Sequence, residues 1–194
     1  MSDKHYTVGG GDGWLNIKSE PGGQIIAVPE YLLVDLTSSK DGRDFFSVLE
    51  GFARGKTFSV KSGHLKRGSP GYHGPVQVTF SLSKKLLNYP GGQIKAITHN
   101  GSQPIPIGLH PIQIPDFPHV LGAYYVGQSP YAKTWFFLGR GNAIPGSNDR
   151  YLHTGEVSNG CITVDPTGWT RLYQYLILCR RGDEKTVGMV TVVR

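Results

Sequence analysis

The sequence is organised around the stretch Arg150-Tyr151-Leu152-His153-Thr154-Gly155-Glu156-Val157-Ser158-Asn159-Gly160-Cys161-Ile162-Thr163-Val164. A β-like run contains His153, a short polar turn follows, and a second β-like run begins at Cys161. The two residues are eight positions apart, so neighbouring strands would place them side by side. A free cysteine titrates near about 8.5, and a histidine within hydrogen-bond reach can take its proton. The stretch therefore predicts a cysteine nucleophile with a histidine base; a buried cysteine and a surface histidine are the structural alternative.

Glycine and proline divide the rest of the chain into short segments, with 27 and 13 residues respectively. Residues 24–28, 31–36 and 76–82 are typical of strands, and 133–139 and 187–193 continue the pattern. Two helices are expected. The first covers 41–54, capped by Asp41 or Asp44, and the second begins at Asp165 and Pro166. The pattern predicts a mainly β fold with a few helices.

The length of 194 residues fits one domain with an elaboration, or two small domains. No apolar run approaches the roughly 20 residues of a spanning helix, and the first residues do not resemble a signal peptide. We therefore expect a protein made in the cytoplasm and either kept there or exported by another route. The two cysteines, Cys161 and Cys179, allow one disulfide. Metal-ligand spacings such as Cys-x-x-Cys are absent, so no metal site is expected.

Positive charge is concentrated in the middle of the chain, which has a net charge of +6 overall. Residues 51–115 contain no acidic residue and eight basic ones: Arg54, Lys56, Lys61, Lys66, Arg67, Lys84, Lys85 and Lys95. Such a segment could bind a polyanion, either a cell-wall polymer or nucleic acid, although no nucleic-acid-binding motif accompanies it. A solvated surface is the simpler explanation. A non-enzymatic polyanion-binding module is the alternative function.

Ser158-Asn159-Gly160-Cys161-Ile162, followed by a capped helix and a final strand, resembles the active-site signature of the YkuD-type L,D-transpeptidases. The segment from Pro104 to His110 is similar to the proline- and glycine-containing segment ahead of that family's core strands. The resemblance covers about residues 85–194. It implies a β-sandwich or barrel catalytic domain over residues 83–194, with residues 1–82 as an N-terminal α+β elaboration of unknown role.

The chain departs from the widespread family pattern at three positions. Histidine is usual where Asn159 stands, arginine where Thr163 stands, and the catalytic histidine where Pro145 stands. The shorter spacing from His153 to Cys161 is more similar to transpeptidase-related toxins delivered by type VI secretion. That resemblance implies an antibacterial effector delivered to the periplasm of a target cell, with an immunity protein as a partner.

The resemblance also implies a reaction on peptidoglycan stem peptides that needs no cofactor. Cys161, activated by His153, would attack the carbonyl before the terminal D-alanine and form a thioester. Water, a D-amino acid or a second stem would resolve it, so carboxypeptidase and transpeptidase activity both stay open. The backbone N–H groups of Gly160 and Cys161 could hold the oxyanion. Ser158 could orient His153 or hold the turn. The substrate-binding candidates are Arg140, Arg150 and Asn159.

A papain-like or NlpC/P60-type hydrolase is a further alternative. Those enzymes place the cysteine before the histidine in the chain. No histidine follows Cys161 in this sequence, which disfavours that class.

Overall fold

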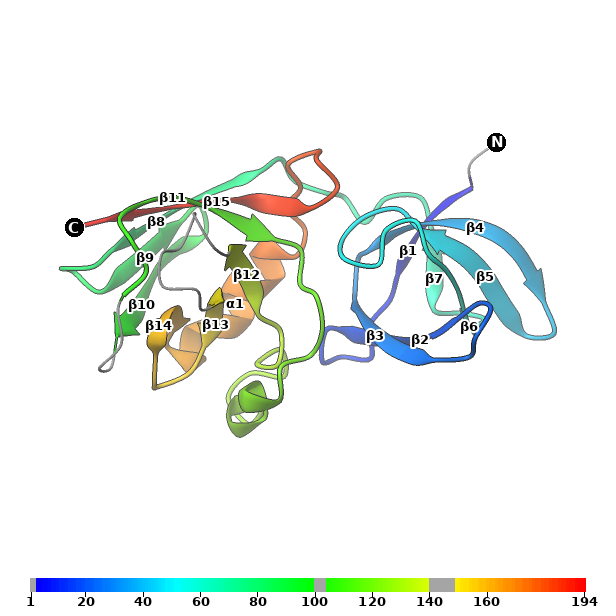
Figure 1. Ribbon diagram of the computed structural model, residues 1–194, viewed down its shortest axis with the longest axis horizontal. Helices are drawn as coiled ribbons and strands as arrows, with labels where there is room; N and C mark the ends of the chain where they lie inside the picture. Colours follow the sequence, from blue (N-terminus) through cyan, green and yellow to red (C-terminus); the bar gives the residue numbers. More distant parts are fainter. Residues whose placement is uncertain (1–2, 100–103, 140–148) are drawn as a thin grey trace.

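The computed structural model describes residues 3–99, 104–139 and 149–194. Within these residues the chain forms fifteen strands, one α-helix and one 3-10 helix, which confirms the expected mainly β fold. The strands make two sheets that lie side by side along the long axis of the molecule (Figure 1). The C-terminus lies at the end of this axis that is away from the N-terminal sheet (Figure 1).

The N-terminal sheet has seven short strands in the order β3-β2-β6-β5-β4-β1-β7. All pairings among its described strands are antiparallel. The strands are β1 (Lys4–Thr7), β2 (Trp14–Ser19), β3 (Ile25–Pro29), β4 (Leu33–Lys40), β5 (Arg43–Val48), β6 (Thr57–Lys61) and β7 (Leu65–Arg67).

The prediction of a helix over residues 41–54 is wrong. Asp41 and Gly42 both have positive φ, 53° and 72°, and form the two-residue turn that joins β4 to β5. Asp-Gly is the typical sequence of such a hairpin turn, because both positions require left-handed backbone. Phe46 and Val48 are buried at strand spacing, whereas Phe52 is 48% exposed. The N-terminal elaboration is therefore built of strands, without an α-helix among its described residues.

The C-terminal sheet has eight strands in the order β11-β15-β8-β9-β10-β14-β13-β12. Its two end strands, β11 and β12, pack near each other, so the sheet curls into a nearly closed barrel. The strand β8 lies before the division expected at residue 82 and belongs to this sheet. The strands are β8 (Val76–Ser81), β9 (Leu86–Tyr89), β10 (Gly92–His99), β11 (Gly108–Gln113), β12 (Phe136–Gly139), β13 (Arg150–Thr154), β14 (Asn159–Val164) and β15 (Thr186–Val193).

The α-helix α1 (Pro166–Leu176) begins as the sequence predicts. Asp165 is its N-cap and accepts a hydrogen bond from the Thr167 backbone N–H at 3.0 Å, with Pro166 in the first turn. Its buried face, which includes Trp169, Leu172, Tyr173 and Leu176, joins the hydrophobic core. The helix follows β14 directly, so its capped start fixes the end of the strand that carries Cys161.

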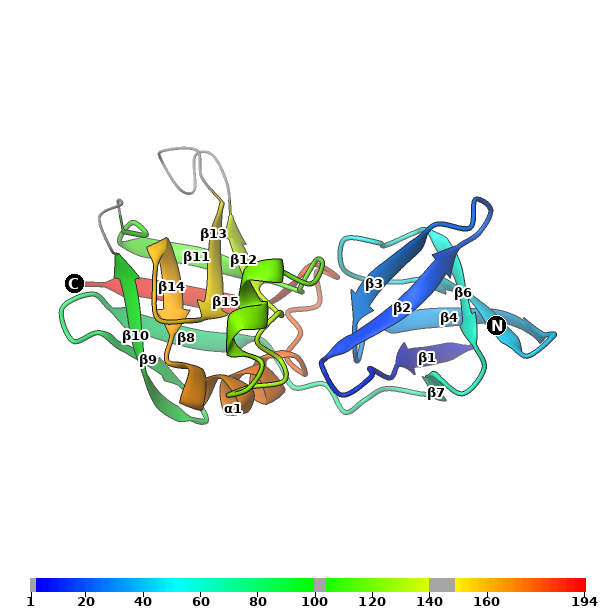
Figure 2. The ribbon, with the colours of Figure 1, turned by 90° about the horizontal axis from the view of Figure 1, so that it is seen from below.

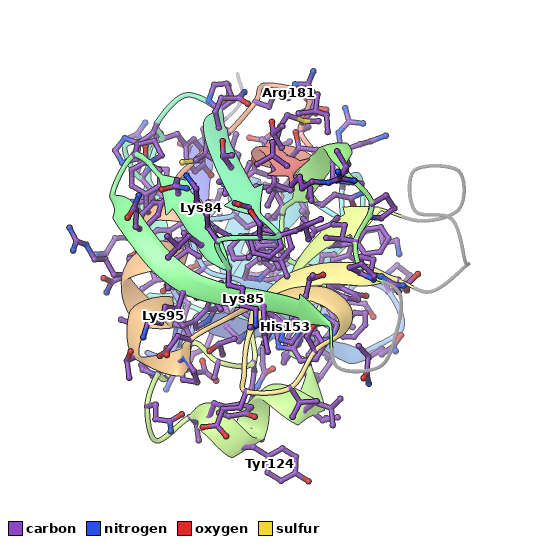
Figure 3. All side chains as sticks on the ribbon, turned by 90° about the vertical axis from the view of Figure 1, so that its left-hand side faces the viewer. Lys84, Lys85, Lys95, Tyr124, His153 and Arg181 are labelled. Carbon is purple, nitrogen blue, oxygen red and sulfur yellow. The ribbon has the colours of Figure 1, made fainter. Side chains whose placement is uncertain are left out.

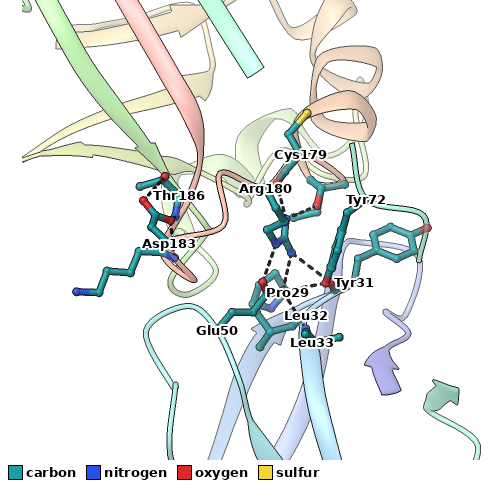
Figure 4. Close-up of polar contacts among 12 residues, drawn as sticks. Pro29, Tyr31, Leu32, Leu33, Glu50, Tyr72, Cys179, Arg180, Asp183 and Thr186 are labelled. Atoms are coloured by element: carbon teal, nitrogen blue, oxygen red, sulfur yellow. Dashed lines mark hydrogen bonds and ion pairs between the residues drawn. The ribbon is translucent and has the colours of Figure 1, made fainter. Parts of the chain in front are cut away.

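A buried ion pair joins the two sheets (Figure 4). Arg180, after α1, contacts Glu50, after β5, through Nε–Oε2 at 2.8 Å and Nη2–Oε1 at 2.9 Å. Tyr72 donates to Glu50 at 2.8 Å, and its ring lies 4.3 Å from the guanidinium. The side chains of Glu50 and Arg180 are only 6% and 9% exposed. The N-terminal sheet is thus tied to the segment that follows the helix behind the candidate site.

Candidate active site

Cys161 lies on β14 at an irregularity in the sheet. On β14, Asn159 and Thr163 pair with His99 and Ile97 of β10, so three β14 residues face a single residue, Thr98. Such a bulge bends a strand and redirects its side chains, and bulges are frequent next to active sites. The irregularity therefore sets the direction of the candidate nucleophile.

Two contacts hold the turn before Cys161. Gly160 has φ +99°, in the left-handed region that favours glycine, and its carbonyl accepts a hydrogen bond from Thr98 Oγ1 at 3.1 Å. The Ser158 hydroxyl donates to the carbonyl of Cys161 at 2.7 Å. Ser158 was expected either to orient His153 or to hold the turn, and this contact corresponds to the second role.

His153 lies on the neighbouring strand β13, and its ring is held at both nitrogens. Nδ1–H donates to the Thr154 carbonyl at 2.8 Å, so Nε2 carries the lone pair of the neutral ring. The Thr163 hydroxyl donates to Nε2 at 3.1 Å. Burial and, to a smaller extent, the charge of His119 lower the pKa of His153 to about 4, although the hydrogen bond to the Thr154 carbonyl acts in the opposite direction. At neutral pH the imidazole is therefore an uncharged acceptor.

β13 and β14 are parallel, and their register decides how the two candidate residues meet. His153 pairs with Thr163, and Leu152 pairs with Ile162. Cys161 consequently lies two residues before Thr163 on β14 and not opposite His153. Its Sγ accepts a hydrogen bond from the Tyr151 backbone N–H at 3.4 Å. The sulfur and the imidazole share a cavity without a hydrogen bond between them. The structure thus brings the predicted pair together but leaves Nε2 engaged by Thr163.

The Cys161 thiol is protonated in this resting arrangement. Burial raises its pKa, while the Tyr151 N–H and the nearby Arg150 charge act in the opposite direction. A neutral thiol beside a neutral imidazole needs a proton transfer before it can attack a carbonyl. The site is therefore a thiol–imidazole pair rather than a preformed thiolate–imidazolium pair.

A cavity of about 290 Å³ opens at Cys161 and His153. Asn159 lines it beside the nucleophile, while aromatic and aliphatic side chains form its outer part. The 3-10 helix η1 (Val120–Tyr125) supplies Leu121, 60% exposed, and Tyr124, 83% exposed. Figures 1 and 2 show η1 outside the barrel, beside the loop between β13 and β14. The Glu156 backbone N–H donates to Tyr125 Oη at 3.1 Å and joins the two segments.

A second cavity, of about 430 Å³, adjoins the first at Gly155. Its lining is more polar and includes Lys95, Glu156 and Asp165, together with Thr163. The carboxylate of Asp165 is already committed to the helix cap. The mainly aromatic cavity at Cys161 thus has a second, more polar cavity next to it, and the two meet at Gly155.

A stack of aromatic rings supports the base from outside. The Trp135 indole is stacked on the His153 ring with centroids 4.2 Å apart, and on the His119 ring at 4.4 Å. His119 contacts Asp116 at 3.2 Å and lies under the Phe117 ring at 4.6 Å. The sequence predicts a strand over residues 133–139, which include Trp135, and assigns no role to Asp116 or His119. No local motif distinguishes them, because the stack forms only in the fold.

The three substrate-binding candidates have different outcomes. Asn159 lines the cavity. Arg150 begins β13 and is 4% exposed, so its charge acts on Cys161 from within the protein. Arg140 lies outside the described residues. In the sequence, Thr163 is only a departure from the family pattern. In the structure it lies opposite His153, and its hydroxyl contacts Nε2 of that ring.

Cys161 and Cys179 are both free thiols, so the disulfide between them is not formed. Cys179 is buried, and its Sγ donates to the Tyr175 carbonyl at 3.3 Å, which indicates a packing role. The described ranges contain no cluster of three or more histidine, cysteine, aspartate or glutamate side chains arranged for a metal ion. In the same ranges, no helix has the length and apolar character needed to cross a membrane.

No protein-family model matches the chain, and no curated protein matches it. Among solved structures, the chain is similar to the crystal structure of Mycobacterium tuberculosis L,D-transpeptidase 1, with 17% identity, 78% of this chain and 71% of that chain covered, and a TM-score of 0.38. It is also similar to an L,D-transpeptidase from Mycobacterium tuberculosis H37Rv, with 13% identity, 95% and 99% coverage, and a TM-score of 0.39. These sequence identities and TM-scores are too low to assign a function to the chain.

Proposed function

We propose that the protein is a cysteine enzyme that removes or exchanges the terminal D-alanine of peptidoglycan tetrapeptide stems. The observation that carries the proposal is the placement of Cys161 and His153 on adjacent strands around one cavity, with the tautomer of His153 set by the Thr154 carbonyl. The family-like sequence around Cys161 supports the choice of substrate.

The reaction begins when His153 Nε2 takes the proton of the Cys161 thiol. The thiolate attacks the carbonyl carbon before D-alanine, and the N–H groups of Gly160 and Cys161 stabilise the oxyanion. The carbon–nitrogen bond breaks, the proton on Nε2 passes to the leaving amine, and a thioester remains on Cys161. Water, or an amine other than the released D-alanine, then attacks the thioester. This step regenerates the thiol and releases the shortened or exchanged stem.

The test is D-alanine release from purified disaccharide-tetrapeptide, measured with wild type and with Cys161→Ala. We expect release with the wild type alone. Chromatography of the remaining muropeptide separates hydrolysis, which yields a tripeptide, from exchange with an added D-amino acid. Equal release by both proteins would exclude Cys161 as the nucleophile.

Delivery to the periplasm of a target cell is part of the proposal, because the substrate lies outside the cytoplasm. The exposed apolar rim of the cavity, formed by Leu121, Tyr124 and Val157, is the surface that an immunity protein would cover. Expression directed to the periplasm is expected to inhibit growth in a Cys161-dependent manner. Unimpaired growth at confirmed expression would contradict the effector role.

The polyanion-binding alternative gains little from the arrangement of the basic residues. Arg54, Lys56, Lys61, Lys66 and Arg67 belong to the N-terminal part, whereas Lys84, Lys85 and Lys95 belong to the barrel. Figure 3 shows the latter three on the side of the barrel that faces the viewer. Binding of a polyanion by either group would weaken steeply with salt and would not depend on Cys161.

A further inference from the structure

We propose that Trp135 is a positioning residue of the catalytic pair, which holds the His153 ring and stabilises the imidazolium formed when Nε2 takes the proton of Cys161. This inference rests on the proposed function, because it assigns a task to His153 as base. It concerns the step that separates charge inside the site before the attack: the S–H bond of Cys161 breaks, an N–H bond forms at Nε2, and a thiolate and an imidazolium result.

The imidazolium needs a stabilising partner that the hydrogen bonds do not supply. Nδ1–H faces the neutral Thr154 carbonyl, and Nε2 faces the neutral Thr163 hydroxyl. Among the described residues, no carboxylate forms a hydrogen bond or ion pair with His153. His153 is 6% exposed, so water does little to stabilise the charge either.

Trp135 is in the right place to supply this stabilisation. Its indole is stacked on the imidazole at 4.2 Å with an angle of 22° between the planes. The face of an indole carries negative electrostatic potential, and tryptophan is the best aromatic partner for a cation within about 6 Å. His153 is buried and Trp135 is half-buried, and the interaction strengthens as the pair is removed from water.

The indole is itself fixed, which separates this contact from a chance stacking. Trp135 Nε1–H donates to the Ala132 carbonyl at 3.2 Å. The His119 ring stacks on the same indole at 4.4 Å and is almost parallel to it, at 5°. His119 is held by Asp116 and by the Tyr151 ring edge at 4.7 Å. The support therefore extends from the loop before η1 to the base.

Other charges around the pair also influence proton transfer, and the test has to separate them from Trp135. The titratable and charged groups near the base and the nucleophile are Cys161 and Arg150 with Asp149 beside the thiol, and His119 with Asp116 next to the indole. Substitution of Trp135 by another uncharged group removes none of these charged groups.

The test uses the pH dependence of Cys161 alkylation by iodoacetamide, followed on the Cys161 peptide by mass spectrometry in the full-length protein. Alkylation reports the thiolate and requires no peptidoglycan. Loss of the indole in Trp135→Leu is expected to move the inflection of the rate–pH curve upward by about one pH unit. Below this inflection, alkylation of Cys161 should be about tenfold slower than in wild type. Trp135→Phe retains an aromatic face and is expected to fall between Trp135→Leu and wild type.

Fluorinated tryptophan provides a test that preserves the shape of the side chain. The chain has three tryptophans, and Trp135 is the one that stacks on His153. Successive fluorination weakens the negative face of the ring, so the inflection should rise step by step. The control is fluorination in a Trp135→Phe background, which should produce no further rise. An inflection that stays constant through the fluorinated series overturns the proposal, whether or not Trp135→Leu folds.

The same measurement separates this inference from the proposed function. If His153→Gln alkylates with the wild-type pH profile, His153 is not the base, and both claims fail. If His153→Gln changes the profile and fluorination does not, the catalytic pair stands and only the role of Trp135 is lost.

Discussion

His153 lies opposite Thr163, not opposite Cys161, in the parallel ladder between β13 and β14. His153 and Cys161 therefore share a cavity while Nε2 accepts a hydrogen bond from the Thr163 hydroxyl at 3.1 Å. Nε2 has a single lone pair, so it can take the proton of Cys161 only when Thr163 releases it. Formation of the proposed reactive pair therefore requires Thr163 to give up this hydrogen bond.

Thr163→Val should make Cys161 more reactive in the absence of substrate. Valine has a similar shape but no hydroxyl, so the lone pair of His153 Nε2 becomes available to the thiol. Release of one hydrogen bond corresponds to about a two- to tenfold faster alkylation at neutral pH. Thr163→Ser retains the hydroxyl and is the matched control, with a rate near wild type. Slower alkylation in Thr163→Val would show that the hydroxyl assists proton transfer.

The stability of the protein should fall as the pH decreases from about 6.5 to 4. The pKa of His153 is lowered by burial to about 4, so the unfolded chain binds a proton that the folded chain does not. This contribution is complete above pH 6.5 and is lost as the pH falls toward the folded pKa, by up to about 3 kcal/mol. Urea unfolding at a series of pH values measures the slope. His153→Gln should reduce that slope in this window; an unchanged slope would show that His153 is not its source.

Glu50→Gln should destabilise the protein strongly, because it leaves the buried Arg180 guanidinium without its carboxylate. Removal of one partner from a buried ion pair costs about 3–5 kcal/mol. Arg54→Gln is the control, since its ion pair with Glu184 also joins the two sheets but is about half exposed. An exposed pair contributes about 0–1 kcal/mol. Equal losses in urea unfolding would contradict this distinction.

Gly160→Ala should reduce activity far more than Gly182→Ala does. Both glycines have positive φ, +99° and +88°, so alanine costs each about 1–3 kcal/mol of backbone strain. Gly160 precedes the nucleophile and contributes a proposed oxyanion N–H, whereas Gly182 lies in the turn before β15. D-alanine release and thermal unfolding, measured together, separate the effects. Equal activity in the two variants would argue against a role of Gly160 in positioning the oxyanion.

Local signals predicted the elements that carry the site. Asp165 and Pro166 indicate the start of α1, and alternating or continuous apolar runs indicate the barrel strands, because these features depend on nearby residues. Over residues 41–54 the spacing of the apolar residues wrongly predicted a helix. Asp41 and Gly42 adopt positive φ values there and form a hairpin turn.

The arrangement around His153 could not be predicted in this way. The contact with Thr163 depends on parallel pairing of strands joined by a short loop, and spacing alone does not define that register. The stacking of Trp135 and His119 joins segments that are distant in sequence from the base. The sequence identified the candidate pair, Cys161 and His153, whereas the fold revealed the groups that contact this pair.

The most direct test of the central claim is the intact mass of the protein after brief incubation with disaccharide-tetrapeptide and acid quenching. We predict that wild type gains the mass of the disaccharide-tripeptide acyl group, that the adduct maps to the Cys161 peptide, and that Cys161→Ala gains nothing. D-alanine should appear in the same sample. An adduct of equal mass on Cys161→Ala, or consumption of the tetrapeptide by that variant at the wild-type rate, would contradict the assignment of Cys161 as the nucleophile.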